Sequence, residues 1–80
     1  MYKFIRIKGE RAKTIGFFVP RLYHLNFDWW TLKRFGFPYL RDRLFGWHIW
    51  WVDNEEDLET ALDGLHELQK THIFKIQISE

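Results

Sequence analysis

The sequence predicts a small single α+β domain, with a four-stranded mostly antiparallel or mixed sheet packed against one long C-terminal helix plus one or two short helices. Three observations predict this class. Stretches rich in β-branched and aromatic residues occur near both ends and in the middle of the chain. Leucines at helical spacing precede the last of these stretches. The 80 residues, 46% of them hydrophobic, leave room for a single domain spanning residues 1–80.

The N-terminal part of the chain is predicted to form a hairpin. Strands are expected over Tyr2–Lys8 and Thr14–Val19, and the polar segment 9–13 between them suits a loop. Pro20 has no backbone N–H, which makes it a natural end for the second strand. Segment 21–26 carries no clear pattern, so its conformation is left open.

Two short helices are predicted in the middle of the chain. Asp28 can cap the first, Trp29–Phe35, and Pro38 can open the second, Pro38–Phe45; a glycine follows each of them. Helices of about two turns are marginal in water when isolated. We therefore expect these two to be held by their aromatic side chains, which would dock on the sheet.

The C-terminal part is predicted to supply a strand, the long helix and a last strand. Trp47–Val52 is apolar on both faces and is expected in the centre of the sheet. Asp53 or Asn54 can cap a helix that ends near Lys70, and His72–Ile78 alternates as a strand. The apolar stripe of that helix consists of Leu58, Ala61, Leu62, Leu65 and Leu68. The predicted order is ββ(αα)βαβ, ending in a right-handed crossover between parallel strands.

A formal net charge of +1 conceals two halves of opposite sign. Residues 1–43 hold ten Lys or Arg against three acids, a net charge of +7, whereas residues 44–80 sum to −6. Ten of the sixteen aromatic residues lie between Phe27 and Trp51, across the boundary. Charge asymmetry of this kind bears on partners rather than on fold, so it indicates a binding surface.

The basic and aromatic segment 21–43 is the main candidate for binding a partner. Trp, Tyr and Arg dominate the energetics of protein interfaces, so we predict a protein partner. The candidate residues are Trp29, Trp30, Arg34, Tyr39, Arg41 and Arg43. The same composition suits single-stranded nucleic acid, because basic side chains neutralise phosphates and rings stack on bases. The balanced net charge and the absence of the aromatic motif of RNA-recognition sheets place this alternative second.

The long helix is expected to present an acidic face. Its members recur every four residues opposite the leucine stripe; they are Glu55, Glu59, Asp63 and Glu67. Acids in the first turn complement the helix dipole, but like charges four residues apart repel. This face is therefore either a solvated surface or a second docking surface for a basic partner. A homodimer or larger oligomer, in which opposite charges of two copies meet, is a further alternative.

The sequence shows no pattern typical of catalysis or of metal binding. The histidines, His24, His48, His66 and His72, lack metal-ligand spacing, and the chain has no cysteine. Glycines are scattered singly rather than gathered in a phosphate-binding loop, and the only serine is Ser79. We therefore expect a protein that is not an enzyme, with no metal, no cofactor and no catalytic residues.

No segment of the sequence suggests a membrane or export. The longest uncharged stretch, Leu44–Val52, has nine residues, against the roughly 20 needed to cross a bilayer. The first residues lack the apolar run of a signal peptide, so we expect a cytoplasmic protein that does not bind a membrane. By its small size and its cysteine-free, aromatic-rich composition alone, such a chain would suit a phage or mobile-element protein that blocks a host machine, anti-CRISPR inhibitors among them.

Overall fold

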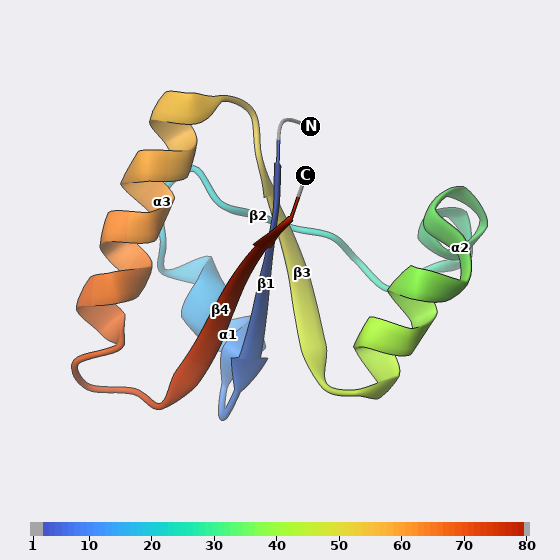
Figure 1. The fold of residues 1–80 in the computed structure, drawn as a ribbon, viewed down its shortest axis with the longest axis horizontal. Helices are drawn as coiled ribbons and strands as arrows, with labels where there is room; N and C mark the ends of the chain where they lie inside the picture. Colours follow the sequence, from blue (N-terminus) through green and yellow to red (C-terminus); the bar gives the residue numbers. More distant parts are fainter. Residues whose placement is uncertain (1–2, 80) are drawn as a thin grey trace.

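The computed structural model, which describes residues 3–79, consists of one sheet with helices on both of its faces (Figure 1). In chain order the elements are β1 (Lys3–Gly9), α1 (Ala12–Phe17), β2 (Tyr23–His24), α2 (Trp29–Leu44), β3 (Trp47–Val52), α3 (Glu55–Leu68) and β4 (Phe74–Ser79). Tyr2, at which the first predicted strand begins, lies outside the described residues. The α+β class is as predicted, whereas the order of elements differs.

The strands lie in the order β2-β3-β1-β4, and every neighbouring pair is antiparallel. Because β3 and β4 both run antiparallel to β1, they are parallel to each other, and α3 connects them past β1. In the same way α1 connects β1 to β2 past β3. This connectivity is the ferredoxin-like β-α-β-β-α-β arrangement, with α2 inserted between the second and third strands. Such a fold defines no function by itself.

The second predicted strand, Thr14–Val19, is wrong, because its first four residues belong to helix α1, which begins at Ala12 and ends at Phe17. Ala12, Ile15 and Val19 are buried and follow each other at helical rather than at strand spacing. The predicted hairpin is wrong for the same reason: β1 pairs with β3 and β4 instead. The actual second strand, β2, falls in segment 21–26, for which the sequence shows no pattern.

Helix α1 packs closely on the sheet because residue 16 is a glycine. A Cβ atom at Gly16 would lie 2.1 Å from the ring of Trp50, closer than any real contact. The Trp50 side chain is completely buried, and Phe17 places its ring edge-on to it at 5.2 Å between centroids. Gly16 and Trp50 therefore fix how α1 approaches β3.

The two predicted short helices are joined into α2, which has a break at Gly36. Gly36 has φ 72° and ψ −154°, a conformation that ends the first half of the helix. The Asp28 carboxylate accepts a hydrogen bond from the Thr31 N–H at 2.8 Å, so it caps the helix as predicted. Pro38 lies in the first turn of the second half, where its missing N–H costs little.

Helix α3 confirms the leucine stripe. The Asn54 side chain accepts a hydrogen bond from the Asp57 N–H at 2.9 Å, so Asn54 is the cap. Leu58, Ala61 and Leu65 are buried, while the other two leucines of the stripe pack partly buried against the same core. The helix ends at Leu68 rather than near Lys70.

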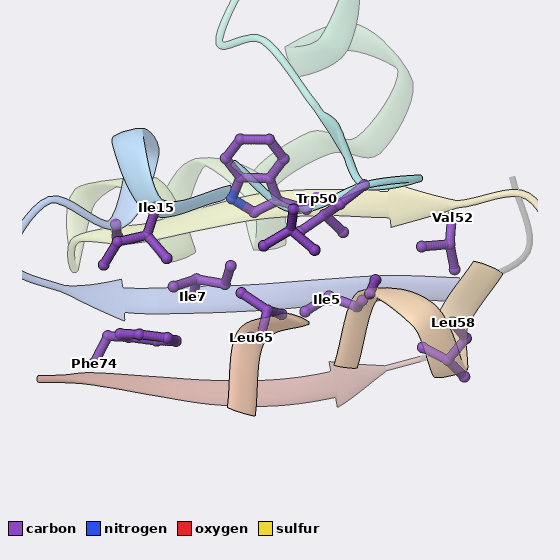
Figure 2. Close-up of a cluster of buried hydrophobic side chains, with 12 residues drawn as sticks. Ile5, Ile7, Ile15, Trp50, Val52, Leu58, Leu65 and Phe74 are labelled. Carbon is purple, nitrogen blue, oxygen red and sulfur yellow. The ribbon is translucent and has the colours of Figure 1, made fainter. Parts of the chain in front are cut away.

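The hydrophobic side chains form two clusters, one on each face of the sheet. The larger cluster lies beneath α1 and α3, where Ile15, Leu58 and Leu65 meet side chains of three strands (Figure 2). The smaller cluster lies beneath α2, where Leu25, Tyr39 and Ile49 are buried among partly buried aromatic rings. Strand β3 is thus covered on both faces, as predicted.

Candidate functional site

The first half of α2 presents two tryptophans to solvent. Trp29 and Trp30 are 71% and 61% exposed, directly after the capping Asp28. The Arg34 guanidinium lies 5.9 Å from the centroid of the Trp30 ring, one helical turn further on. Lys33, four residues after Trp29, is also exposed. The sequence-predicted residues Trp29, Trp30 and Arg34 therefore lie together on one exposed surface of the helix.

The second half of α2 adds a stripe that the sequence prediction largely missed. Phe37 is 70% exposed, and Arg41 and Leu44 are exposed as well. Only Arg41 was among the candidates. The signal is the spacing of four and three residues between Phe37, Arg41 and Leu44, which places them on one side of a helix. We call Trp29, Trp30, Lys33, Arg34, Phe37, Arg41 and Leu44 together the α2 surface.

Tyr39 and Arg43, the other two candidates on α2, face the sheet instead. Tyr39 is only 5% exposed, and its hydroxyl donates a hydrogen bond to the Leu25 carbonyl at 3.1 Å. Burial raises the pKa of Tyr39. The Arg43 guanidinium stacks over Phe27 at 5.5 Å and is half-buried. These two residues anchor α2, so we leave them out of the α2 surface.

Two of the four histidines meet beside Arg43. Its guanidinium donates to His48 Nδ1 at 2.8 Å, and His24 Nε2 lies 3.4 Å from the same nitrogen. Burial lowers the pKa of His48 to about 4, and the guanidinium adds to this effect. Burial also lowers the pKa of His24, against a hydrogen bond with the Asn26 side chain. Both rings are therefore neutral near pH 7, and Arg43 already occupies the Nδ1 acceptor of His48.

A small cavity lies between α2 and the sheet. Its volume is about 170 Å³, and it is lined by Phe4, Arg6, Leu25, Phe35, Pro38, Tyr39, Asp42 and Ile49. The Arg6 guanidinium pairs with the Asp42 carboxylate at 3.0 Å and lies 4.9 Å from the centroid of the Trp47 ring. The Nε atom of Arg6 is buried and has no hydrogen-bond partner among the described residues.

The acidic face predicted on α3 is exposed on the opposite side of the sheet from α2 (Figure 1). Its members, Glu55, Glu59, Asp63 and Glu67, are all exposed. Helix α3 contains six acids and no Lys or Arg, whereas α2 contains four bases and one acid. The sheet therefore separates the acidic helix α3 from the basic and aromatic helix α2.

The described part of the chain holds no group of three or more histidine, aspartate or glutamate side chains arranged to bind a metal ion. His24 and His48 meet, while His66 is exposed and the His72 ring contacts Thr71 instead. Within residues 3–79, no helix combines the length and the apolar character needed to cross a membrane.

Comparisons of the chain with protein-family models, with curated proteins and with solved structures found no match. A functional proposal must therefore be built from the residues of the chain itself, above all from the exposed rings of α2.

Proposed function

We propose that this protein is a non-catalytic interaction protein that binds a protein partner through the α2 surface. The observation that carries the proposal is the exposure of three large aromatic side chains, Trp29, Trp30 and Phe37, on one helix. The same chain buries Trp50 completely, so its fold has the means to bury large rings. Exposed apolar groups gathered on one element are typical of interaction sites.

The charges of the α2 surface define the kind of partner. Lys33 and Arg34 follow Trp29 and Trp30 by one helical turn, and Arg41 follows Phe37 by the same spacing. The described residues offer none of these three cations an ion-pair partner. Aromatic side chains and arginine are the groups that protein interfaces favour. The proposed partner therefore presents an apolar surface bordered by acidic residues.

The proposed mode of action is the blocking or modulation of that partner in the cytoplasm. A phage or mobile-element inhibitor of a host machine, such as an anti-CRISPR protein, would act in this way. Such a role needs affinity and no catalysis. It is compatible with a small chain whose exposed rings gather on one helix.

The test begins with a photo-reactive aromatic residue in place of Phe37, used to cross-link the partner in cells. The same probe at Glu59, exposed on the acidic face of α3, is the matched control. The captured protein is then purified, and its affinity is measured for wild type, Trp30→Ala, Arg34→Ala and Glu59→Ala. We expect Trp30→Ala to weaken binding about 30-fold or more, as a hot-spot residue does, and Glu59→Ala to change it less than about twofold.

Three results would overturn the proposal. Wild-type affinity of both α2 variants would remove the site from α2. Loss of binding in Glu59→Ala alone would assign the site to α3. Loss of the folded circular dichroism signal in Trp30→Ala would place Trp30 in the core.

Self-association is a second candidate function, favoured by the separation of charge across the sheet. The basic α2 of one copy would face the acidic α3 of the next, a head-to-tail contact that extends into chains unless it closes into a ring. Because this attraction is electrostatic, it is weakened by salt. Light scattering at low and high salt tests it: a particle mass that falls as salt rises supports self-association, and a monomer at both salt concentrations rejects it.

A further inference from the structure

The face of the sheet beneath α2 is only partly covered. Helix α2 packs on β3. The ring of Phe35, on α2, contacts the ring of Phe4, on β1, edge-on at 5.5 Å between centroids. Further across the same face, Lys8 of β1 and the β4 side chains Lys75 and Gln77 are exposed. An open strip of sheet therefore runs beside the helix.

Two lysines lie next to each other in this strip. The register pairs Lys8 with Lys75 on one side and with Trp47 on the other. Like charges directly opposite each other destabilise a sheet. Neither lysine forms an ion pair with another described residue, and the Lys8 ammonium instead lies 5.8 Å from the centroid of the Trp47 ring. A bound anion would offset the repulsion between the two ammonium groups.

The cavity described above begins two residues further along the same strand. Arg6 and Lys8 point to the same face of β1, about 7 Å apart along the strand. The cavity volume of about 170 Å³ is close to that of an apolar cavity of about 150 Å³ known to hold benzene. Its aromatic walls, Phe4 and Phe35, suit a planar ring.

The polar end of the cavity offers both hydrogen-bonding roles. The buried Arg6 Nε–H is a donor without a partner among the described residues. The Asp42 carboxylate accepts from Arg6 at 3.0 Å and keeps further lone pairs. A ligand whose ring edge carries an acceptor next to a donor would satisfy both groups.

We propose that this face binds one nucleotide unit, with its base in the cavity and its phosphate between Lys8 and Lys75. Phosphate oxygens are natural partners of lysine, and aromatic walls suit a nucleobase. The nucleotide is either free or part of a single strand, because a base held in a duplex cannot enter a cavity. This site is separate from the α2 surface and does not depend on the proposed protein partner.

Fluorescence anisotropy of labelled single-stranded RNA and DNA oligonucleotides, at low and near-physiological salt, tests the phosphate contacts. We expect Lys8→Gln/Lys75→Gln to bind about tenfold more weakly than wild type. Its salt slope should be smaller by about 0.7, the value for one single-strand phosphate. The matched control, Lys33→Gln/Arg34→Gln, removes the same charge from α2 and should bind within about twofold of wild type. Circular dichroism confirms that each variant is folded.

Competition experiments test the base and distinguish the two sources. Adenosine monophosphate should displace the oligonucleotide at about tenfold lower concentration than ribose 5-phosphate, because only the former carries a ring for the cavity. An oligonucleotide that binds more tightly than the mononucleotide identifies a strand as the ligand, and equal affinity identifies a free nucleotide.

Three outcomes would overturn the inference. If no oligonucleotide binds at low salt and adenosine monophosphate does not bind either, the nucleotide site is rejected. This holds even if a protein partner is cross-linked at Phe37. If the two double variants weaken oligonucleotide binding equally, the binding depends on the net charge of the protein and not on a site at Lys8 and Lys75. Equal competition by ribose 5-phosphate would remove the base from the cavity.

Discussion

The two faces of the sheet are covered in different ways. On one face α1 and α3 enclose a continuous cluster in which Ile5, Trp50 and Leu65 have no exposed surface. On the other face the buried hydrophobic cluster beneath α2 consists of Leu25, Tyr39 and Ile49, with a cavity and an ion pair beside it. The same strands thus support a closed apolar core and a partly open, polar contact.

This difference separates the residues that stabilise the fold from those that remain free to bind. Each half of α2 is too short to be stable alone, so the helix depends on anchors such as Tyr39 and Phe35. Once these anchors hold it, the rest of the helix surface is not needed for packing. Substituting the exposed tryptophans of α2 should therefore lower the free energy of unfolding only slightly, whereas substituting Trp50 should lower it strongly.

The largest expected effect comes from Trp50. Trp50→Ala removes a completely buried ring between α1 and β3 and should lower the free energy of unfolding by about 3–5 kcal/mol. Urea denaturation followed by circular dichroism measures this change. A loss of less than about 1 kcal/mol would mean that the first face is not the main source of stability.

A smaller effect is expected at Gly16. A Cβ atom there would meet the Trp50 ring, so Gly16→Ala should destabilise the protein by about 1–3 kcal/mol through overpacking. The double variant Gly16→Ala/Trp50→Phe tests the cause, because the smaller ring leaves room for the methyl group. We expect the two costs to be less than additive. Strict additivity would show that the two positions do not contact each other.

Acid should lower the stability of the protein by protonating the histidine pair near α2, His24 and His48. The pKa of His48 is about 4 in the folded protein, below the value of about 6.5 in an unfolded chain. Between these values the unfolded chain binds more protons, so the free energy of unfolding falls as the pH decreases from about 6.5 to 4. The lowered pKa of His24 acts in the same direction.

The free energy of unfolding should fall by about 2 kcal/mol. This is less than the full pKa difference of His48 would give, because the ring is only half-buried and solvent screens its charge. The cations that oppose protonation of His48 are Arg43 on α2, His24 on β2 once it is protonated, and Lys13 on α1. Urea denaturation at pH 7 and at pH 4.5 measures the loss. In His48→Gln, whose amide oxygen still accepts from Arg43, the loss should shrink. An unchanged pH dependence in this variant would contradict the assignment.

Elements with a local sequence pattern are predicted correctly from the sequence. Elements whose conformation depends on tertiary contacts are not. The cap Asp28 and the leucine stripe of α3 depend on near neighbours, and both were predicted. For the cap of α3 the sequence left Asp53 and Asn54 open, and the structure selects Asn54. The sequence predicts a strand over Thr14–Val19, where helix α1 forms, because Ile15 and Val19 alone suit either spacing in so short a segment. The close approach of Gly16 to Trp50, far apart in the sequence, packs this helix on the sheet and cannot be seen in the local pattern.

The candidate site was predicted in part for a similar reason. The exposed residues Trp29, Trp30 and Arg34 were identified from composition, but composition could not show that Tyr39 faces Leu25. The cavity and the pairing of Lys8 with Lys75 need the strand register, which joins residues from opposite ends of the chain. No single-sequence pattern carries that register.

The smallest expected effect on stability is that of Trp30→Ala, and it completes the comparison between the two faces. Trp30 is 61% exposed, and among the described residues its ring contacts the Arg34 guanidinium on the same helix. Exposed substitutions of this kind usually change the free energy of unfolding by no more than about 0.5 kcal/mol. Urea denaturation of Trp30→Ala beside Trp50→Ala, the same chemical change on opposite faces, measures the contrast directly. Similar losses in the two variants would mean that α2 contributes to stability as much as α1 and α3 do, and its exposed rings would then have a structural role instead of a binding one.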